Sequence, residues 1–139
     1  KIFICSLWDY LFNCLRVERG DNMSTKQEVG KLGEDLATKY LKCTGYRILE
    51  RNFRGKQGEI DIIATEQNQI IFVEVKARTN VKYGRPAEAV NSQKQAHIVK
   101  TAQYYVCKNK LENKKIRFDV VEVYLITGKY KIKHIKNAI

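Results

Sequence analysis

The sequence predicts an α/β domain in which a central mixed β-sheet is flanked by α-helices. The 139 residues are 44% apolar, which is enough to bury one core that is covered on two sides. Segments of helical period alternate with shorter strand-like runs in the order helix, three strands, helix, two strands, without an internal repeat. Helices packed against one sheet are the simplest architecture for that order.

The first half of this pattern contains one helix and three strands. Apolar residues at three- and four-residue spacing predict a helix over 25–43, which the Thr44-Gly45 pair ends. Strands are predicted at 46–53, 59–65 and 70–77. A basic, glycine-bearing loop at 54–58 and a polar turn at 66–69 separate them.

The second half begins with a long basic loop over 78–86, which holds Gly84 and the single proline and has the composition of a mobile flap. A helix is predicted over 87–110, and strands at 118–126 and 130–135 form a hairpin. We expect Tyr104 and Tyr105 to lie in the core rather than stack on bases. The helical row Gln93, His97, Lys100 and Tyr104 is interpreted as a solvent-facing polar stripe.

Charge points to an acidic partner. Lys and Arg number 26 against 15 Asp and Glu, which gives a formal net charge of +11. Residues 1–22 are neutral, whereas residues 108–139 hold nine basic and three acidic side chains. Such an excess is typical of proteins that bind nucleic acid or another anionic surface, and nucleic acid is the leading candidate.

The four cysteines show no CxxC pair, and the two histidines, His97 and His134, are far apart in the sequence. This spacing argues against a structural zinc site and against a disulfide scaffold. Reduced thiols in a cytoplasmic protein fit best. We expect no membrane partner.

Residues 1–22 are expected to be an N-terminal extension to a domain that spans 23–139. The run from Ile2 to Val17 is apolar and aromatic, so a signal or anchor segment is one interpretation. However, Asp9, Asn13 and Arg16 interrupt it, and no A-x-A-like cleavage site follows. We favour an amphipathic extension, or a start site placed upstream of Met23.

The predicted strand at 70–77 ends with two charged residues, Glu74 and Lys76. Period-two alternation places both on the face that begins with Ile70 and Phe72. Both faces of this strand begin apolar, so we expect it to be covered on both sides, where an unpaired charge costs several kcal/mol. One interpretation is that Glu74 and Lys76 only neutralise each other at the end of the strand.

Further carboxylates favour a chemical role. Asp61 lies inside the apolar run of the neighbouring strand, so buried acids outnumber the one lysine, and an excess of carboxylate is how proteins hold a hard divalent cation. Glu34 precedes Ala37 and Leu41 by three and seven residues, which places it on the core-facing side of the first helix. Alternatively, Glu34 is a carboxylate in the N-terminal turn of the helix, where the helix dipole favours a negative charge.

These residue types in this pattern predict metal-dependent phosphodiester hydrolysis. One or two Mg²⁺ (or Mn²⁺) ions held by carboxylates polarise the phosphoryl oxygen, supply hydroxide near neutral pH and stabilise the leaving oxygen. A lysine beside the metal orients or deprotonates the attacking water. Asp61, Glu74 and Lys76 are therefore the predicted catalytic residues, and Glu34 is the fourth.

Basic residues near this constellation are expected to contact the phosphates of a bound nucleic acid. They come from the two basic loops and from the start of the second helix, and they are Arg54, Lys56, Arg78, Lys82, Arg85 and Lys94.

Four motifs together resemble one known family. They are Gly33-Glu34, then 58–61 (GEID), then 72–78 (FVEVKAR), then 117–121 (RFDVV), and the chain in this respect is similar to the YraN-type family (UPF0102) of small uncharacterised bacterial proteins. That family resembles the restriction-endonuclease-like superfamily with its D…(D/E)xK signature, and within it the Holliday-junction resolvases. The resemblance implies a restriction-endonuclease-like mixed sheet, metal ligands at Asp61 and Glu74, the Val75 carbonyl as a backbone ligand, Lys76 as the catalytic lysine and Glu34 as the helix carboxylate.

Two functions follow as hypotheses. The first is a Mg²⁺-dependent endonuclease that acts on branched or otherwise structured DNA in repair, recombination or DNA processing, for which a homodimer would suit two-strand cutting. The alternative is a non-catalytic accessory protein that keeps the fold and binds nucleic acid through its net charge.

Overall fold

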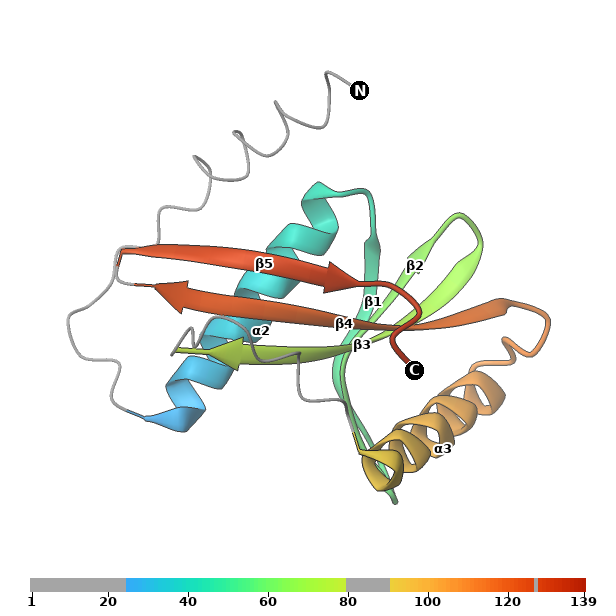
Figure 1. The fold of residues 1–139 in the computed structure, drawn as a ribbon. Helices are drawn as coiled ribbons and strands as arrows, with labels where there is room; N and C mark the ends of the chain where they lie inside the picture. Colours follow the sequence, from blue (N-terminus) through green and yellow to red (C-terminus); the bar gives the residue numbers. More distant parts are fainter. Residues whose placement is uncertain (1–24, 80–90, 127) are drawn as a thin grey trace.

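The structure is a computed structural model, and its described residues are 25–79, 91–126 and 128–139. Within them lie two helices and five strands (Figure 1). The helices are α2 (Lys26–Cys43) and α3 (Ser92–Lys108). The strands are β1 (Arg47–Gly55), β2 (Gly58–Glu66), β3 (Gln69–Arg78), β4 (Lys115–Ile126) and β5 (Lys129–Ile135).

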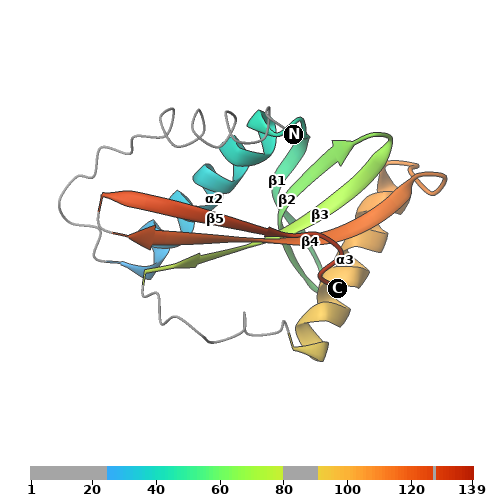
Figure 2. The ribbon, with the colours of Figure 1, turned by 45° about the horizontal axis from the view of Figure 1, so that its top comes forward.

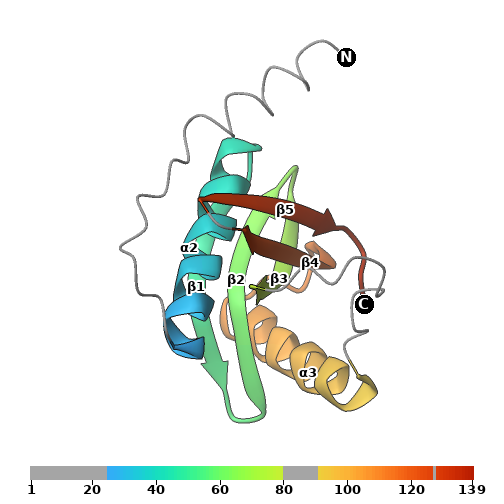
Figure 3. The same cartoon turned by 60° about the vertical axis from the view of Figure 1, so that its left-hand side comes forward.

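The five strands form one mixed sheet in the order β1-β2-β3-β4-β5. Only β3 and β4 pair in parallel, and α3 lies between them in the sequence; the other three pairs are antiparallel. The two helices lie on opposite sides of the sheet (Figures 1 and 3). The predicted mixed sheet flanked by helices is therefore confirmed. In the described part of the chain, no helix is both long and apolar enough to cross a bilayer.

Side chains of β3 alternate between the two cores, as its sequence predicts. Ile71 and Val73 join the cluster under α2, whereas Ile70 and Phe72 join the cluster under α3. All four are at most 4% exposed. The central strand is thus covered on both faces, and any charge near its end is held close to a low-dielectric interior.

Three details differ from the sequence-based expectation. The predicted loop at 54–58 is a tight hairpin, because β1 runs to Gly55 and β2 starts at Gly58. The helix predicted from 87 begins at Ser92, where the Asn91 side chain caps it by accepting the Lys94 N–H; the predicted flap falls mostly on 80–90, outside the described residues. Tyr104 is 52% exposed, so its placement in the core was wrong, whereas Tyr105 is buried as predicted.

Helix α2 approaches β3 so closely that only glycine fits at residue 33. A Cβ built on Gly33 would lie 2.5 Å from the Cβ of Ala77, which is closer than two carbon atoms can pack. Gly30, one turn earlier, has no heavy atom within 4 Å of such a Cβ. Of these two glycines, only Gly33 lies against a neighbouring element. This contact holds the first half of α2 against the end of β3.

We expect Gly33→Ala to destabilise the protein, because the added methyl must displace α2 or β3. The expected loss is about 1 to 3 kcal/mol of unfolding free energy, as for other overpacked cores. Gly30→Ala is the matched control and should gain up to about 1 kcal/mol from helix propensity alone. Urea unfolding measures both. Adding Ala77→Gly to Gly33→Ala should recover part of the loss, and a Gly33→Ala variant as stable as wild type would contradict the close approach.

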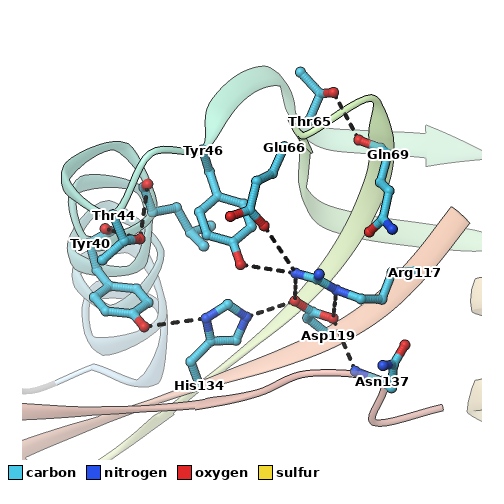
Figure 4. A network of polar contacts seen from close by, with 11 residues as sticks. Tyr40, Thr44, Tyr46, Thr65, Glu66, Gln69, Arg117, Asp119, His134 and Asn137 are labelled. Atoms are coloured by element: carbon cyan, nitrogen blue, oxygen red, sulfur yellow. Dashed lines mark hydrogen bonds and ion pairs between the residues drawn. The ribbon is translucent and has the colours of Figure 1, made fainter. Parts of the chain in front are cut away.

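A buried polar network ties β4 and β5 to the C-terminal part of α2 (Figure 4). Its centre is Asp119, which is fully buried and accepts hydrogen bonds from Arg117 Nε and Nη2, both at 2.9 Å. His134 Nε2 lies 2.7 Å from Asp119, and His134 Nδ1 lies 3.3 Å from the Tyr40 hydroxyl. Arg117 also donates to the Tyr46 hydroxyl at 2.9 Å. Arg117 and Asp119, two residues apart on β4, thus form a buried ion pair.

Burial raises the pKa of Asp119, but hydrogen bonds from His134, Arg117 and the Asn137 N–H outweigh it and hold that pKa below its ordinary value of 3.8. A carboxyl whose pKa is lower in the folded than in the unfolded state stabilises the fold above the unfolded pKa. That stabilisation is lost as the pH falls through the folded pKa. The network therefore contributes to stability at neutral pH and not in strong acid.

Asp119→Asn should cost about 3 to 5 kcal/mol of unfolding free energy at pH 7, because Arg117 then keeps a charge without its buried partner. The loss should shrink as the pH is lowered below about 4. Urea unfolding from pH 7 down to pH 3 measures both effects. Asp35→Asn is the control, since Asp35 pairs with Arg51 at 2.7 Å on the surface and should be worth about 1 kcal/mol or less. Equal effects of the two variants would contradict the role of Asp119.

Candidate functional site

Asp61 lies where β2 parts from β3. The ladder between the two strands runs from Glu66 paired with Gln69 to Ile62 paired with Val73, and it stops there. The Val75 N–H, which lies beyond that last pair, donates to Asp61 Oδ2 at 2.8 Å. Since the N–H and C=O of one strand residue project to the same side, the Val75 carbonyl faces the same gap. The Asp61 carboxylate thus replaces the backbone carbonyl that would otherwise accept the Val75 N–H. We call this point, where β2 and β3 separate, the fork.

Glu74 lies on β3 beside this fork, and its side chain is 10% exposed. Its Oε1 accepts a short hydrogen bond from the ammonium of Lys94, in the first turn of α3. Period-two alternation predicted that Glu74 would lie on the α3 side, and this contact agrees. The sequence indicated no partner for Glu74 twenty residues away, because the β3–α3 connection determines which residue of α3 reaches the strand.

The surroundings of Asp61 and Glu74 shift the pKa of Asp61 strongly. The pKa of Asp61 is raised to about 7, mainly by burial and then by the nearby charges of Glu74 and, more weakly, Glu34. The hydrogen bond from Val75 opposes this shift. Asp61, Glu74 and Glu34 are therefore within electrostatic reach of one another, and their negative charge is only partly compensated.

Glu34 lies at the edge of this group rather than in its centre. Its side chain is 24% exposed, and Arg51 Nη2 on β1 is 4.0 Å away. The Asn52 side-chain amide lies between two acids; in the amide orientation that satisfies both of its polar atoms, the nitrogen donates to Glu34 Oε2 at 3.1 Å and to Glu59 Oε1 at 3.2 Å. Burial raises the pKa of Glu34, while Asn52 and Arg51 lower it. Glu34 is therefore partly exposed on α2 and lies close enough to Asp61 to raise its pKa.

Lys76 follows Glu74 on the same face of β3 and is half-buried. Its register partner on the parallel neighbour β4 is Glu122, which is fully buried. Glu122 Oε2 accepts a short hydrogen bond from the Tyr124 hydroxyl, and among the described residues Oε1 has no hydrogen-bond partner. Sequence reasoning did not single out Glu122. The available signal was its position in the apolar, valine-rich run at 119–126, which is typical of a strand that is covered on both faces.

The donor set suits a hydrated Mg²⁺ rather than a closed metal cage. In ranges 25–79, 91–126 and 128–139, no three acidic, histidine or cysteine side chains form a complete ligand group. Mg²⁺ commonly keeps several water ligands and needs only one or two protein carboxylates plus substrate phosphate. Asp61 and Glu74, with the Val75 carbonyl beside them, match that requirement. Glu34 as a direct ligand stays a prediction.

The basic residues predicted to contact phosphate fall into three groups. Arg54 and Lys56 are exposed on the β1–β2 hairpin, where Arg54 Nε lies 3.3 Å from Glu59. Arg78 ends β3 just past Lys76. Lys94 is half-exposed and forms an ion pair with Glu74. Lys82 and Arg85 lie outside the described residues.

Comparison with known proteins identifies the family. The model of the uncharacterised protein family UPF0102 matches residues 33–123. UPF0102 proteins of Caldanaerobacter subterraneus subsp. tengcongensis and Clostridioides difficile are 51% and 52% identical over 116 and 112 residues, covering 81% of this chain and 95% and 96% of theirs. A UPF0102 protein of Clostridium botulinum strain 657 is 54% identical over 115 residues, 81% of this chain and 94% of its own. The chain belongs to the UPF0102 family.

The UPF0102 match confirms the predicted YraN-type family and spans Glu34, Asp61, Glu74 and Lys76. The family is described as uncharacterised, so its name assigns no activity to these residues. A solved structure titled crystal structure of SSO0001 is similar over 99% of this chain and 79% of its own, at 16% identity and a TM-score of 0.38. A likeness that weak carries no inference about function.

Removing the Asp61 charge should not harm the metal-free fold. In Asp61→Asn the amide oxygen can still accept from the Val75 N–H, while repulsion from Glu74 disappears. We expect the unfolding free energy in EDTA to equal or exceed that of wild type. Asp61→Ala should lose about 1 to 3 kcal/mol, because the Val75 N–H is left unpaired. Urea unfolding compares them, and an Asn variant as unstable as the Ala variant would show that Asp61 is held for its charge in the fold.

Proposed function

We propose that this UPF0102 protein is a Mg²⁺-dependent endonuclease that hydrolyses phosphodiester bonds in DNA, with branched or otherwise structured DNA as its substrate. One observation carries the proposal. Two carboxylates lie side by side where β2 parts from β3, the buried Glu74 and the partly buried Asp61, and Lys76 follows Glu74 on the same strand face. A fold has no structural need for adjacent buried acids, whose repulsion and desolvation both oppose folding.

The proposed mechanism assigns one task to each group. Asp61, Glu74 and the Val75 carbonyl would hold the cation, which supplies charge stabilisation and an acidified water when bound. Asp61 is oriented for this by the Val75 N–H. Lys76, projecting from the rigid β3 strand, would orient the attacking water and take its proton. Partial burial of these groups lowers the local dielectric constant, which strengthens each electrostatic contact.

Nucleic acid is the proposed substrate because of charge. The chain carries a formal net charge of +11. The carboxylates of the candidate site form a small acidic region in this basic protein. Arg54 and Lys56 on the hairpin and Arg78 at the end of β3 could engage phosphates that flank the scissile bond. A basic surface around an acidic centre allows a polyanion to bind while the centre retains its cation.

A second function is favoured by the Lys94–Glu74 ion pair. The Lys94 ammonium already neutralises Glu74, as it would in a protein that keeps the fold, binds nucleic acid and performs no cleavage. In that case the ion pair is structural. If the protein is an enzyme, Lys94 and the cation compete for Glu74, and nucleic-acid phosphates offer Lys94 another partner.

Cleavage should require Asp61 and Lys76 while binding should not. Four-way-junction, flap, single-stranded and duplex DNA would be incubated with wild type, Asp61→Asn and Lys76→Ala in Mg²⁺ and in Mn²⁺. We expect each variant to lose about 100-fold or more in cleavage rate, with DNA affinity in EDTA within about threefold of wild type. Lys39→Ala, an exposed lysine of α2 on the opposite side of the sheet from α3, is the control. Absence of cleavage by wild type on every substrate would contradict the enzyme.

Mn²⁺ titration calorimetry separates the two functions. An enzyme should bind Mn²⁺ in the wild type, lose the binding in Asp61→Asn, and bind at least as tightly in Lys94→Ala, where Glu74 is released. A non-catalytic protein should bind no Mn²⁺ in any of the three, and Lys94→Ala should only lower its stability.

A further inference from the structure

One side of α3 carries basic and aromatic groups without acidic ones. His97, Lys100, Tyr104 and Lys108 recur at spacings of three and four residues, so they lie along one side of the helix. All four are exposed. The helix contains no Asp or Glu from Ser92 to Lys108, so no residue of α3 neutralises this side. We call these four residues the α3 stripe.

The α3 stripe is continuous with the β1–β2 hairpin. A Cβ built on Gly58 would lie 3.4 Å from the His97 Cβ, and one built on Gly55 would lie 3.8 Å from Tyr104 Cδ1. Both glycines therefore bring the hairpin backbone against the helix, and Figure 3 shows the hairpin end beside α3. Arg54 and Lys56 of the hairpin are thereby placed next to the stripe, and Arg54 offsets Glu59.

Tyr104 is held in a fixed orientation although half of it is exposed. Its ring stacks on Phe53 of β1, with centroids 6.0 Å apart and planes 24° from parallel. Lys108 Nζ lies 5.9 Å from the centroid of the same Phe53 ring. A single exposed tyrosine is ordinary on a protein surface. A tyrosine braced by a second ring, beside a lysine and within a strip that lacks acids, matches the chemistry of a platform on which a nucleic-acid base stacks.

The helix also connects this platform to the candidate site. Lys94 in its first turn contacts Glu74, and Tyr104 follows ten residues later, about 15 Å along the helix axis. That length corresponds to about four nucleotides at the spacing of one duplex strand. A strand whose scissile phosphate lay at Glu74 could therefore run along the α3 stripe and reach Tyr104.

We propose that the α3 stripe, together with Arg54 and Lys56, binds an unpaired segment of the DNA substrate, and that a base about four nucleotides from the cut stacks on Tyr104. This rests on the proposed nuclease function for the nature of the ligand. Gln93, His97, Lys100 and Tyr104 are all exposed, which agrees with the predicted solvent-facing row, and the proposal assigns a ligand to that side of the helix. Lysines and the histidine contact phosphates, and the ring contacts the base, so affinity should depend on both salt and single-strandedness.

The test measures binding without cleavage. Fluorescence anisotropy in EDTA would follow a labelled 12-nucleotide single strand and a blunt duplex of the same sequence. Tyr104→Ala should weaken single-strand binding at least about fivefold, with less than a twofold effect on the duplex, whose bases offer no free face. Tyr104→Phe keeps the ring and should stay within twofold of wild type. Lys100→Ala should weaken both ligands and lower the salt slope by about 1, whereas Lys39→Ala on α2 should change neither.

Each outcome decides between the proposals. If Tyr104→Ala folds, as judged by its circular dichroism and urea midpoint, and binds the single strand like wild type, the base platform is wrong, and cleavage that depends on Asp61 would leave the nuclease proposal standing. If Tyr104 and Lys100 matter for binding but wild type cuts nothing, the surface is right and the nuclease is wrong. A loss of self-association in Tyr104→Ala with unchanged DNA binding would assign the stripe to a contact between copies of the chain.

Discussion

The structure depends on one constraint, which is that β3 must bury both of its faces and still end in charged residues. Its apolar half is sealed by α2 on one side and α3 on the other, so Glu74 enters the interior before the strand reaches solvent. A buried carboxylate needs a cation or strong donors nearby. Lys94 meets that need for Glu74, and the Val75 N–H meets part of it for Asp61.

Each nearby element is shaped by the same requirement. β2 leaves β3 at Ile62, because the next position, Asp61, uses its side chain instead of its backbone to satisfy Val75. α2 carries a glycine against Ala77, which lets Glu34 approach the end of β3. The Asp119 network connects β4 and β5 to the C-terminal part of α2 through hydrogen bonds and ion pairs. The charged groups of the Asp119 network pair with one another and stabilise the fold. The carboxylates at the end of the β2–β3 ladder, in contrast, keep negative charge that is only partly compensated.

The sequence predicted the features that depend on local periodicity, namely the face of a strand or helix on which a residue lies. The alternation in 70–77 placed Glu74 on the α3 side, and the spacing in α2 placed Glu34 inward. It did not predict partners that depend on how elements join. Lys94 reaches Glu74 across twenty residues, and His134 reaches Asp119 across a hairpin. Asn52 lies between Glu34 and Glu59 at a backbone φ of 52°, a conformation that asparagine adopts more readily than most residues. Tyr104 was misplaced because neighbouring aromatics on a helix face different directions, and only Tyr105 points into the core.

The position of Lys94 connects the proposed cation site with the proposed DNA-binding side of α3. Lys94 is the residue at which the acidic fork and the basic α3 stripe meet, and Glu74 can be neutralised by this ammonium or by a divalent cation. In the free protein the ammonium holds the carboxylate. If DNA binds along α3 as proposed, its phosphates would lie near the first turn of that helix and would attract Lys94 away from Glu74. Substrate binding and cation binding would then strengthen each other, since thermodynamic linkage is reciprocal, and the acidic fork would take up its cation when DNA is present.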